Sequence, residues 1–254
     1  MLHFFEKGQG QPIVLIHGFC EISEMWRSYA KELSTEFRVI CPDLPGFGKS
    51  SIASDQITLE EVAVQLEEWM SENQISNPIV IGHSLGGYIA LALLELMGSK
   101  IKAVGLFHST AFPDDQEKKE MRDRTVVFLM KNGVNKFVTT FVPQLFPEPR
   151  RDELQTQIDL AIAQAKESTL DGLIAFTRAM RDRKDRLEVL EQFSGPKLLI
   201  AGSLDGAVKI EASRAQKDAF TDYFELEETG HMGMVERKNE TLGIVRGFCL
   251  NSIR

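Results

Sequence analysis

Short apolar runs that alternate with segments of helical period constrain the fold of this chain more than any other feature. Strands buried on both faces are near-continuous apolar runs, and strands separated by helices are typical of βαβ units with a parallel sheet. The sequence therefore predicts an α/β protein with a mostly parallel sheet flanked by helices. The predicted buried strands are residues 13–16, 38–41, 78–81 and 197–201, with weaker candidates at residues 103–107 and 222–226.

One long segment interrupts this alternation. Residues 113–185 contain no strand-like run, and their apolar residues recur only at helical spacing. We therefore expect two parts. Residues 1–112 and 186–254 would form an α/β core, and residues 113–185 would form an all-helical cap.

The charge balance disfavours two classes of partner. The 254 residues include 37 acidic and 29 basic side chains, for a formal net charge of −8, and no run of Lys and Arg forms a basic face. Nucleic acids and anionic membranes attract basic surfaces, so we expect neither as a partner. The composition leaves the oligomeric state open between a monomer and a homodimer.

Cysteine usage and the N-terminal sequence predict a cytoplasmic protein. Cys20, Cys41 and Cys249 are too few and too scattered for a disulfide framework, and no CxxC motif suggests a zinc site. The charged residues Glu6 and Lys7 stand where a secretory signal would need its apolar region. No apolar stretch approaches the roughly 18 to 20 residues that cross a bilayer.

The most specific motif is a G-x-S-x-G sequence formed by Gly82, Ser84 and Gly86. It follows the predicted strand 78–81 and precedes a helical run, which is the context that a nucleophile elbow requires. The sharp turn presents the serine hydroxyl at the edge of the sheet, and the glycines let the backbones approach closely. A Gly-rich turn of a nucleotide-binding sheet is the alternative, but the flanking elements favour Ser84 as a nucleophile.

A serine nucleophile needs a histidine base and an acid that orients the histidine. In chains with such an elbow the order is serine, acid, histidine, and His231 is the only histidine late in the sequence. Asp205 follows the strand 197–201, and His231 follows the strand 222–226. Taken singly, Asp205 could be a turn residue and His231 a structural histidine. A serine, an acid and a histidine that each follow a separate strand, in the required order, favour a catalytic triad instead.

An acyl-transfer site also needs two backbone N–H groups that stabilise the oxyanion. The N–H of Leu85, which follows the nucleophile, is one candidate. The second is the N–H of Phe19, in an early strand-to-helix loop where Gly18 allows a tight turn. We expect His17, in the same loop, to brace the backbone without taking part in proton transfer.

The Gly-rich segment 43–50 resembles a phosphate-binding loop only at its Gly-Lys-Ser end. A Walker A motif requires a glycine at the position of Asp43. Because Pro45 and Gly46 are typical turn residues, we interpret the segment as a turn after a strand.

Together these motifs resemble the α/β-hydrolase superfamily, in its serine-nucleophile branch of esterases and perhydrolases. The resemblance rests on His17-Gly18-Phe19, residues 43–50, Gly82-His83-Ser84-Leu85-Gly86-Gly87, Gly202-x-x-Asp205 and Gly230-His231. It implies an eight-stranded sheet, a helical cap inserted between strands six and seven, and a triad of Ser84, Asp205 and His231. The first strand of that sheet looks missing or very short, because His17 comes so early in the chain.

The nucleophile narrows the choice within the superfamily. Epoxide hydrolases and haloalkane dehalogenases have Asp at the elbow, and dienelactone hydrolases have Cys, so Ser84 favours other members. The resemblance leaves open a carboxylesterase, a thioesterase, a lactonase, a carbon–carbon bond hydrolase or a perhydrolase.

We therefore expect a carboxylesterase-like hydrolase that cleaves an ester-type bond of a small, largely apolar substrate through an acyl-enzyme on Ser84. This chemistry requires no metal and no organic cofactor. Candidate substrate-binding residues are Trp26 near the oxyanion loop and Phe128, Phe137 and Phe141 of the cap, although such cap aromatics more often form core. The alternative is a ligand-sensing protein of the same fold, with slow turnover, whose cap contacts a partner protein.

Overall fold

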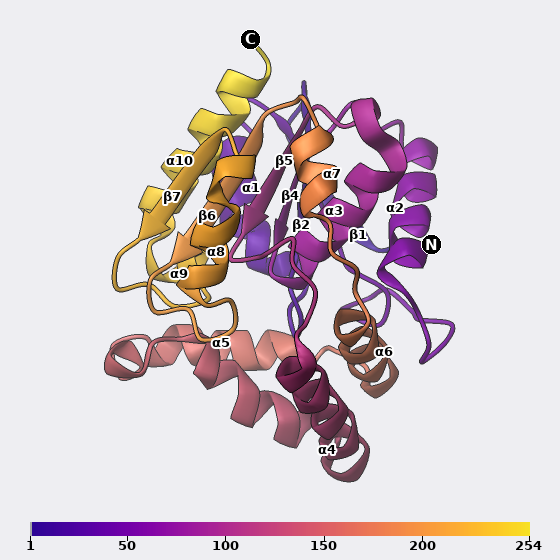
Figure 1. The fold of residues 1–254 in the computed structure, drawn as a ribbon, viewed down its shortest axis with the longest axis vertical. Helices are drawn as coiled ribbons and strands as arrows, with labels where there is room; N and C mark the ends of the chain where they lie inside the picture. Colours follow the sequence, from indigo (N-terminus) through magenta and orange to yellow (C-terminus); the bar gives the residue numbers. More distant parts are fainter. Residues whose placement is uncertain (1) are drawn as a thin grey trace.

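The computed structural model describes residues 2–254, and a seven-stranded sheet forms the centre of the molecule (Figure 1). The strands are β1 (Phe4–Lys7), β2 (Pro12–Ile16), β3 (Arg38–Pro42), β4 (Ile79–His83), β5 (Ala103–Phe107), β6 (Lys197–Gly202) and β7 (Asp222–Leu226). Their order in the sheet is β1-β3-β2-β4-β5-β6-β7. All neighbours are parallel except β1 and β3. The predicted α/β class and the six predicted strands are confirmed.

The sheet differs from the eight strands that the resemblance implies. The described residues form seven, and the N-terminal one, β1, is a short antiparallel strand at the edge. Only Phe4 and Phe5 of its four residues are apolar, so its sequence signal is weak. The long helical segment lies between β5 and β6, the fifth and sixth of the seven described strands. These are strands six and seven of the expected sheet when its first strand is missing, as the sequence leads us to expect.

Helices cover both faces of the sheet (Figure 1). The flanking helices are α1 (Arg27–Leu33), α2 (Leu59–Glu72), α3 (Leu85–Met97), α7 (Leu187–Gln192), α8 (Ile210–Gln216), α9 (Gly233–Glu236) and α10 (Lys238–Ser252). α1 and α10 lie together on one face, where the hydroxyls of Tyr29 and Thr241 form a hydrogen bond. α2 and α3 pack against each other on the other face, and α2 begins with a capping box formed by Thr58 and Glu61.

Residues 113–185, which we call the helical segment, form α4 (Gln116–Phe141), α5 (Gln155–Ala165) and α6 (Leu170–Arg181). In Figure 1 these three helices lie below the sheet, beyond the ends of its strands. α4 and α6 pack against each other. The Thr169 N–H, at the start of α6, donates to the Gly46 carbonyl (2.8 Å) and so joins the segment to the α/β part.

A buried ion pair closes the two ends of the helical segment. The Asp114 carboxylate and the Arg183 guanidinium are 2.6 Å apart, and both side chains are almost fully buried. The same guanidinium lies 4.2 Å over the ring of Tyr88 in α3, and the Arg186 N–H donates to the Ala111 carbonyl (2.9 Å). Both ends of the segment are therefore fastened to the same region of the α/β part.

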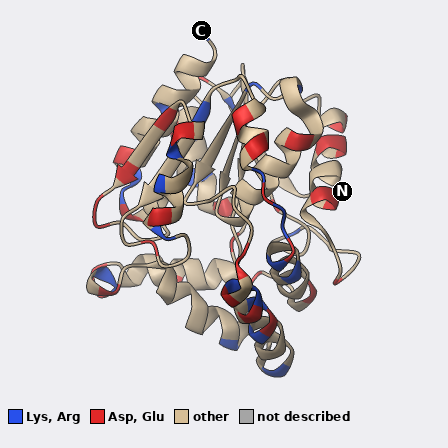
Figure 2. Ribbon diagram, viewed as in Figure 1, with Lys and Arg blue, Asp and Glu red and all other residues tan. Residues whose placement is uncertain are grey.

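Charged side chains of both signs are spread over the helices, and almost none lie on the central strands (Figure 2). Every residue of β4 and β5 is buried, as expected for central strands with helices on both faces. Within residues 2–254, no helix is both long and apolar enough to cross a membrane.

Candidate active site

A sharp turn between β4 and α3 holds Ser84. Its φ of 49° and ψ of −115° lie in a region that residues other than glycine rarely adopt. The flanking glycines permit the turn, because a Cβ on Gly82 would lie 2.1 Å from the Gly86 carbonyl carbon, and one on Gly86 would lie 2.4 Å from the Ile16 oxygen. The Ser84 N–H donates to the Phe107 carbonyl (2.9 Å) and fixes the turn to β5. The serine thus stands at the carboxyl end of β4.

The strained backbone of Ser84 predicts an effect on stability. Glycine adopts positive φ without steric cost, and a strained non-glycine residue costs about 1–3 kcal/mol. We expect Ser84→Gly to raise the free energy of unfolding by about 1 kcal/mol, because relief of strain exceeds the entropy cost of glycine. Urea unfolding beside Ser99→Gly, in an exposed turn, checks this. A loss of stability in both variants would contradict it.

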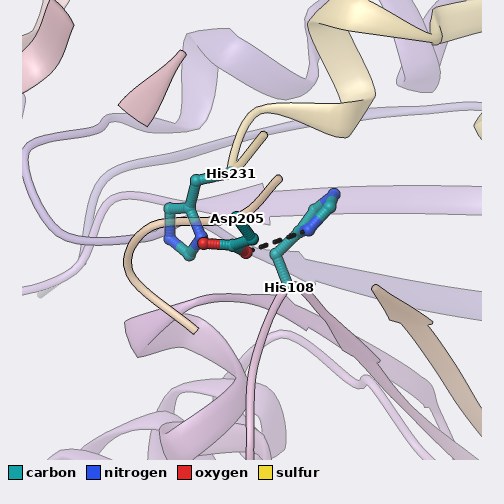
Figure 3. A group of neighbouring side chains, drawn as sticks. All are labelled: His108, Asp205 and His231. Carbon is teal, nitrogen blue, oxygen red and sulfur yellow. Dashed lines mark hydrogen bonds and ion pairs between the residues drawn. The ribbon is translucent and has the colours of Figure 1, made fainter. Parts of the chain in front are cut away.

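Asp205 and His231 meet after the ends of β6 and β7 (Figure 3). His231 Nδ1 and Asp205 Oδ2 are 2.7 Å apart, the length of a charge-assisted hydrogen bond. The other carboxylate oxygen, Oδ1, accepts from the N–H groups of Ala207 and Val208 (2.8 and 2.9 Å). Because Nδ1 donates to Asp205, His231 Nε2 is the nitrogen left to accept a proton.

The His231 backbone is held on two sides. Its N–H donates to the Leu145 carbonyl of the helical segment (2.8 Å), and its carbonyl accepts from His83 Nε2 (2.9 Å). Since His83 precedes Ser84, these contacts place His231 beside the elbow. No hydrogen bond joins the Ser84 and His231 side chains in this structure, and without substrate such catalytic contacts are often long.

Burial and charge oppose each other in the pair of Asp205 and His231. Burial lowers the pKa of His231, but the Asp205 carboxylate outweighs it, so the pKa lies above its ordinary value. Burial would raise the pKa of Asp205, but the charge of His231, its hydrogen bond and the nearby His108 imidazole hold this pKa well below its usual range. Asp205 is therefore ionised and orients the imidazole as a base requires.

A second histidine contacts the same carboxylate. His108 follows β5, and its Nδ1 lies 3.2 Å from Asp205 Oδ2 in a bent approach that is not a well-directed hydrogen bond. Burial lowers the pKa of His108 to about 4, so this imidazole is neutral at pH 7. Ligand atoms of His108, Asp205 and His231 lie within 4.8 Å of one another, a spacing open to a divalent metal ion. The short Asp205–His231 hydrogen bond is the relation that a triad requires.

Two backbone N–H groups of buried residues near the elbow are of particular interest, because they donate to no group within residues 2–254 and were predicted to stabilise the oxyanion. They belong to Phe19 and Leu85. His17 braces the first of these loops: its Nδ1 donates to the Gly18 carbonyl (2.8 Å), and its Nε2 accepts from the Leu44 N–H (2.9 Å). Both of its ring nitrogens are therefore occupied, which leaves none for proton transfer.

Three of the predicted substrate-binding residues gather around the oxyanion loop. The ring centroids of Phe137 and Phe141 lie 6.1 and 5.9 Å from that of Phe19. Phe128 joins the same cluster, 6.2 Å from Phe137. α4 therefore places an aromatic cluster against the loop that carries a candidate oxyanion donor.

Trp26 lies elsewhere than predicted. Its side chain has no exposed surface and packs against Tyr29 and Phe107, with ring centroids 5.3 and 6.0 Å away. A large apolar ring is most stable where it loses most contact with water, and here that place is the interior between α1 and the sheet. Trp26 is a core residue and not a wall of the substrate pocket.

A cavity of about 730 Å³ opens between the helical segment and the α/β part, a size that suits a small ligand. Its lining is mainly apolar and includes Cys20, Val142, Leu145 and Met232. Cys20 and Met232 directly follow Phe19 and His231 in the chain, so the cavity lies next to the loops that carry these two residues. Ser84 is not part of its lining.

Comparison with known proteins defines the family. Residues 11–156 match the family described as alpha/beta hydrolase fold, and the chain belongs to this family. A thermophilic esterase from Thermogutta terrifontis is similar in structure, with a TM-score of 0.92 and 26% identity, covering 99% of this chain and 93% of that one. The enol-lactonase from Burkholderia xenovorans LB400 has a TM-score of 0.89 at 21% identity, covering 98% and 96%, a likeness of fold alone.

Two relatives in sequence cover most of the chain. The pimeloyl-[acyl-carrier protein] methyl ester esterase of Vibrio atlanticus (strain LGP32) is 29% identical over 221 residues, which cover 84% of this chain and 83% of that protein. The dihydrolipoyllysine-residue acetyltransferase component of the acetoin cleaving system of Pseudomonas putida is 28% identical over 242 residues. That match covers 93% of this chain but only 63% of the length of the relative.

The sequence analysis assigns no role to His108 and Glu21, which the structure places at the site. His108 follows β5, which pairs with β6, and Asp205 follows β6. Adjacent parallel strands end at the same edge, so this contact could have been predicted. Glu21 lies four residues after His17, and nothing in the sequence shows that its carboxylate turns inward.

Proposed function

We propose that the protein is a serine hydrolase that cleaves an ester-type bond of a small, largely apolar substrate through an acyl-enzyme on Ser84. The observation that carries the proposal is the 2.7 Å hydrogen bond between His231 and Asp205 beside a strained serine turn. The similarity to two proteins named esterase supports an ester bond as the target.

The proposed reaction is acyl transfer to a serine and then to water. Ser84 Oγ attacks the carbonyl carbon while His231 Nε2 takes its proton, and Asp205 stabilises the imidazolium. The free N–H groups of Phe19 and Leu85 stabilise the oxyanion of the tetrahedral intermediate. His231 returns the proton to the leaving alcohol. Water then attacks the acyl-enzyme with His231 again as base, which releases the acid and restores the serine.

We also propose that residues 113–185 act as a cap domain on an α/β core made of residues 1–112 and 186–254. Two observations support these boundaries. The segment contains helices and no strand, and the buried ion pair of Asp114 and Arg183 joins its two ends. A cap in this place would cover the carboxyl ends of the strands, where the proposed triad lies.

The experiment that tests the proposed function follows hydrolysis of p-nitrophenyl esters from acetate to octanoate by stopped flow. Sustained turnover is expected, together with covalent labelling of Ser84 by a fluorophosphonate, located by peptide mass spectrometry. A single burst that then stalls would favour a ligand-sensing protein with slow turnover. Turnover without labelling of Ser84 would contradict the proposed nucleophile.

The aromatic cluster around Phe19 predicts a change in chain-length preference. Phe141 is partly buried and lies 5.9 Å from Phe19, so Phe141→Ala should open space beside the oxyanion loop. We expect the best p-nitrophenyl ester to become longer, with about tenfold less activity on acetate. Phe224→Ala, at a more exposed ring on β7, is the matched control and should keep the wild-type order of esters. An unchanged order in Phe141→Ala would exclude this residue from the pocket.

A further inference from the structure

Glu21 and His83 form a buried pair that connects three loops of the site. The Glu21 side chain lies in the interior and His83 has no exposed surface. Glu21 Oε2 accepts from the Gly18 N–H (2.5 Å) in the oxyanion loop and lies 2.9 Å from His83 Nδ1 in the elbow. On its other side, His83 Nε2 lies 2.9 Å from the His231 carbonyl. One chain of hydrogen bonds thus joins the oxyanion loop, the elbow and the loop of the proposed base.

The partners of His83 determine where its protons lie. A carbonyl oxygen only accepts hydrogen bonds, so His83 Nε2 must carry a proton toward His231. The other nitrogen, Nδ1, faces the Glu21 carboxyl oxygen that already accepts from Gly18. A neutral imidazole has one N–H, so it cannot donate at both nitrogens. Either His83 is a doubly protonated imidazolium beside a Glu21 carboxylate, or the Glu21 carboxyl group holds the shared proton.

We propose that Glu21 and His83 are a charged pair, carboxylate and imidazolium, that positions the oxyanion loop against the elbow and the His231 loop. The inference rests on the proposed function, because it concerns the rate of acyl transfer at Ser84. Neither residue touches the reacting atoms, so both are positioning residues.

The surroundings of Glu21 favour the ionised form. Burial would raise the pKa of the Glu21 carboxyl group, but His83 and the Gly18 N–H together bring it below its ordinary value. The fit is also close: a Cβ on Gly18 would lie 2.8 Å from both Glu21 Oε2 and His83 Nδ1. Replacing one residue of a buried ion pair destabilises the protein, because the charge of the other residue is then left without a partner.

Glu21 and His83 hold the loop that carries the candidate oxyanion donor Phe19. Gly18, which donates to Glu21, directly precedes Phe19, whose free N–H is a candidate oxyanion donor. Oxyanion hydrogen bonds strengthen in the transition state more than in the substrate complex. A small shift of the loop should therefore lower kcat and leave KM nearly unchanged.

The test compares Glu21→Gln, His83→Gln and the double variant on a p-nitrophenyl ester. Glu21→Gln keeps the shape but removes the charge, so His83 can no longer donate on both sides. We expect kcat to fall by about 10- to 100-fold in each single variant, with KM within about threefold of the wild type. If the two residues act as one unit, the double variant should lose no more than the worse single variant.

Asp114→Asn is the matched control, because it removes an equally buried carboxylate from an ion pair at the ends of the helical segment. It should lower the melting temperature and leave kcat within about threefold. Losses that multiply in the double variant, a kcat of Glu21→Gln equal to that of the wild type, or an equal kcat loss in Asp114→Asn would overturn the proposal.

A second measurement decides the charge state without any substrate. In ¹⁵N-histidine NMR spectra at neutral pH, His83 should show two protonated ring nitrogens, assigned by the signals missing in His83→Gln, and only one in Glu21→Gln. A singly protonated His83 in the wild type would overturn the charged pair. If the wild type shows no Ser84-dependent ester hydrolysis, the proposed function fails, and the NMR result still decides whether the charged pair exists.

Discussion

Ser84→Ala is expected to lower kcat for p-nitrophenyl butyrate by about 10⁴- to 10⁶-fold. The substitution removes the oxygen that would form the acyl-enzyme and leaves the N–H groups of Phe19 and Leu85 in place, so a small residual rate should remain. Initial rates at saturating ester, corrected for the reaction without protein, measure the effect.

The control for this prediction is Ser99→Ala, the same substitution at an exposed serine after α3. Ser99→Ala should keep the wild-type rate, and both variants should unfold within a few degrees of the wild type, because an alanine at position 84 retains a similar backbone strain. A rate for Ser84→Ala within tenfold of the wild type would contradict the nucleophile. A matching loss in Ser99→Ala would show that the assay reports on folding.

Strands are predicted well where burial on both faces makes them apolar throughout. Five predicted runs form strands in the interior of the sheet: the four stronger ones and the weaker run Ala103–Phe107. Their sequences are apolar because helices cover both faces of the sheet. β1 was harder to predict, because it is an edge strand with only two apolar residues. An edge strand depends on pairing with β3, which is a long-range contact that local sequence does not show.

Some residues of the candidate site could likewise be predicted from the sequence, and others could not. The positions of Ser84, Asp205 and His231 at one edge of the sheet could be predicted, because each residue follows a strand and parallel strands end at the same edge. The orientation of Trp26 could not be predicted, because its contacts with Tyr29 and Phe107 depend on packing that the sequence does not show. The same holds for Glu21, whose partners are 3 and 62 residues away in the chain.

Asp205→Asn is expected to lower kcat by about 10⁴-fold, although the side chain keeps its shape. In the wild type the carboxylate accepts from His231 Nδ1 (2.7 Å), which leaves Nε2 free to take the serine proton. The amide can instead donate to Nδ1 and so place the imidazole proton on Nε2, where it blocks the base. Asp218→Asn, at an exposed position, should keep the wild-type rate.

The pH dependence of Asp205→Asn should change in a defined direction. His231 acts as a base only when neutral, so activity is lost as pH falls through its pKa. In the wild type Asp205 raises this pKa above the ordinary value, against the effect of burial, which puts the acidic limb of kcat/KM above about pH 6.5. Without the carboxylate, burial dominates and the pKa falls, so the limb of the residual activity should move to lower pH. Profiles of both proteins between about pH 5 and 9 measure this shift, and an acidic limb that stays in place would show that Asp205 does not control the protonation of the base.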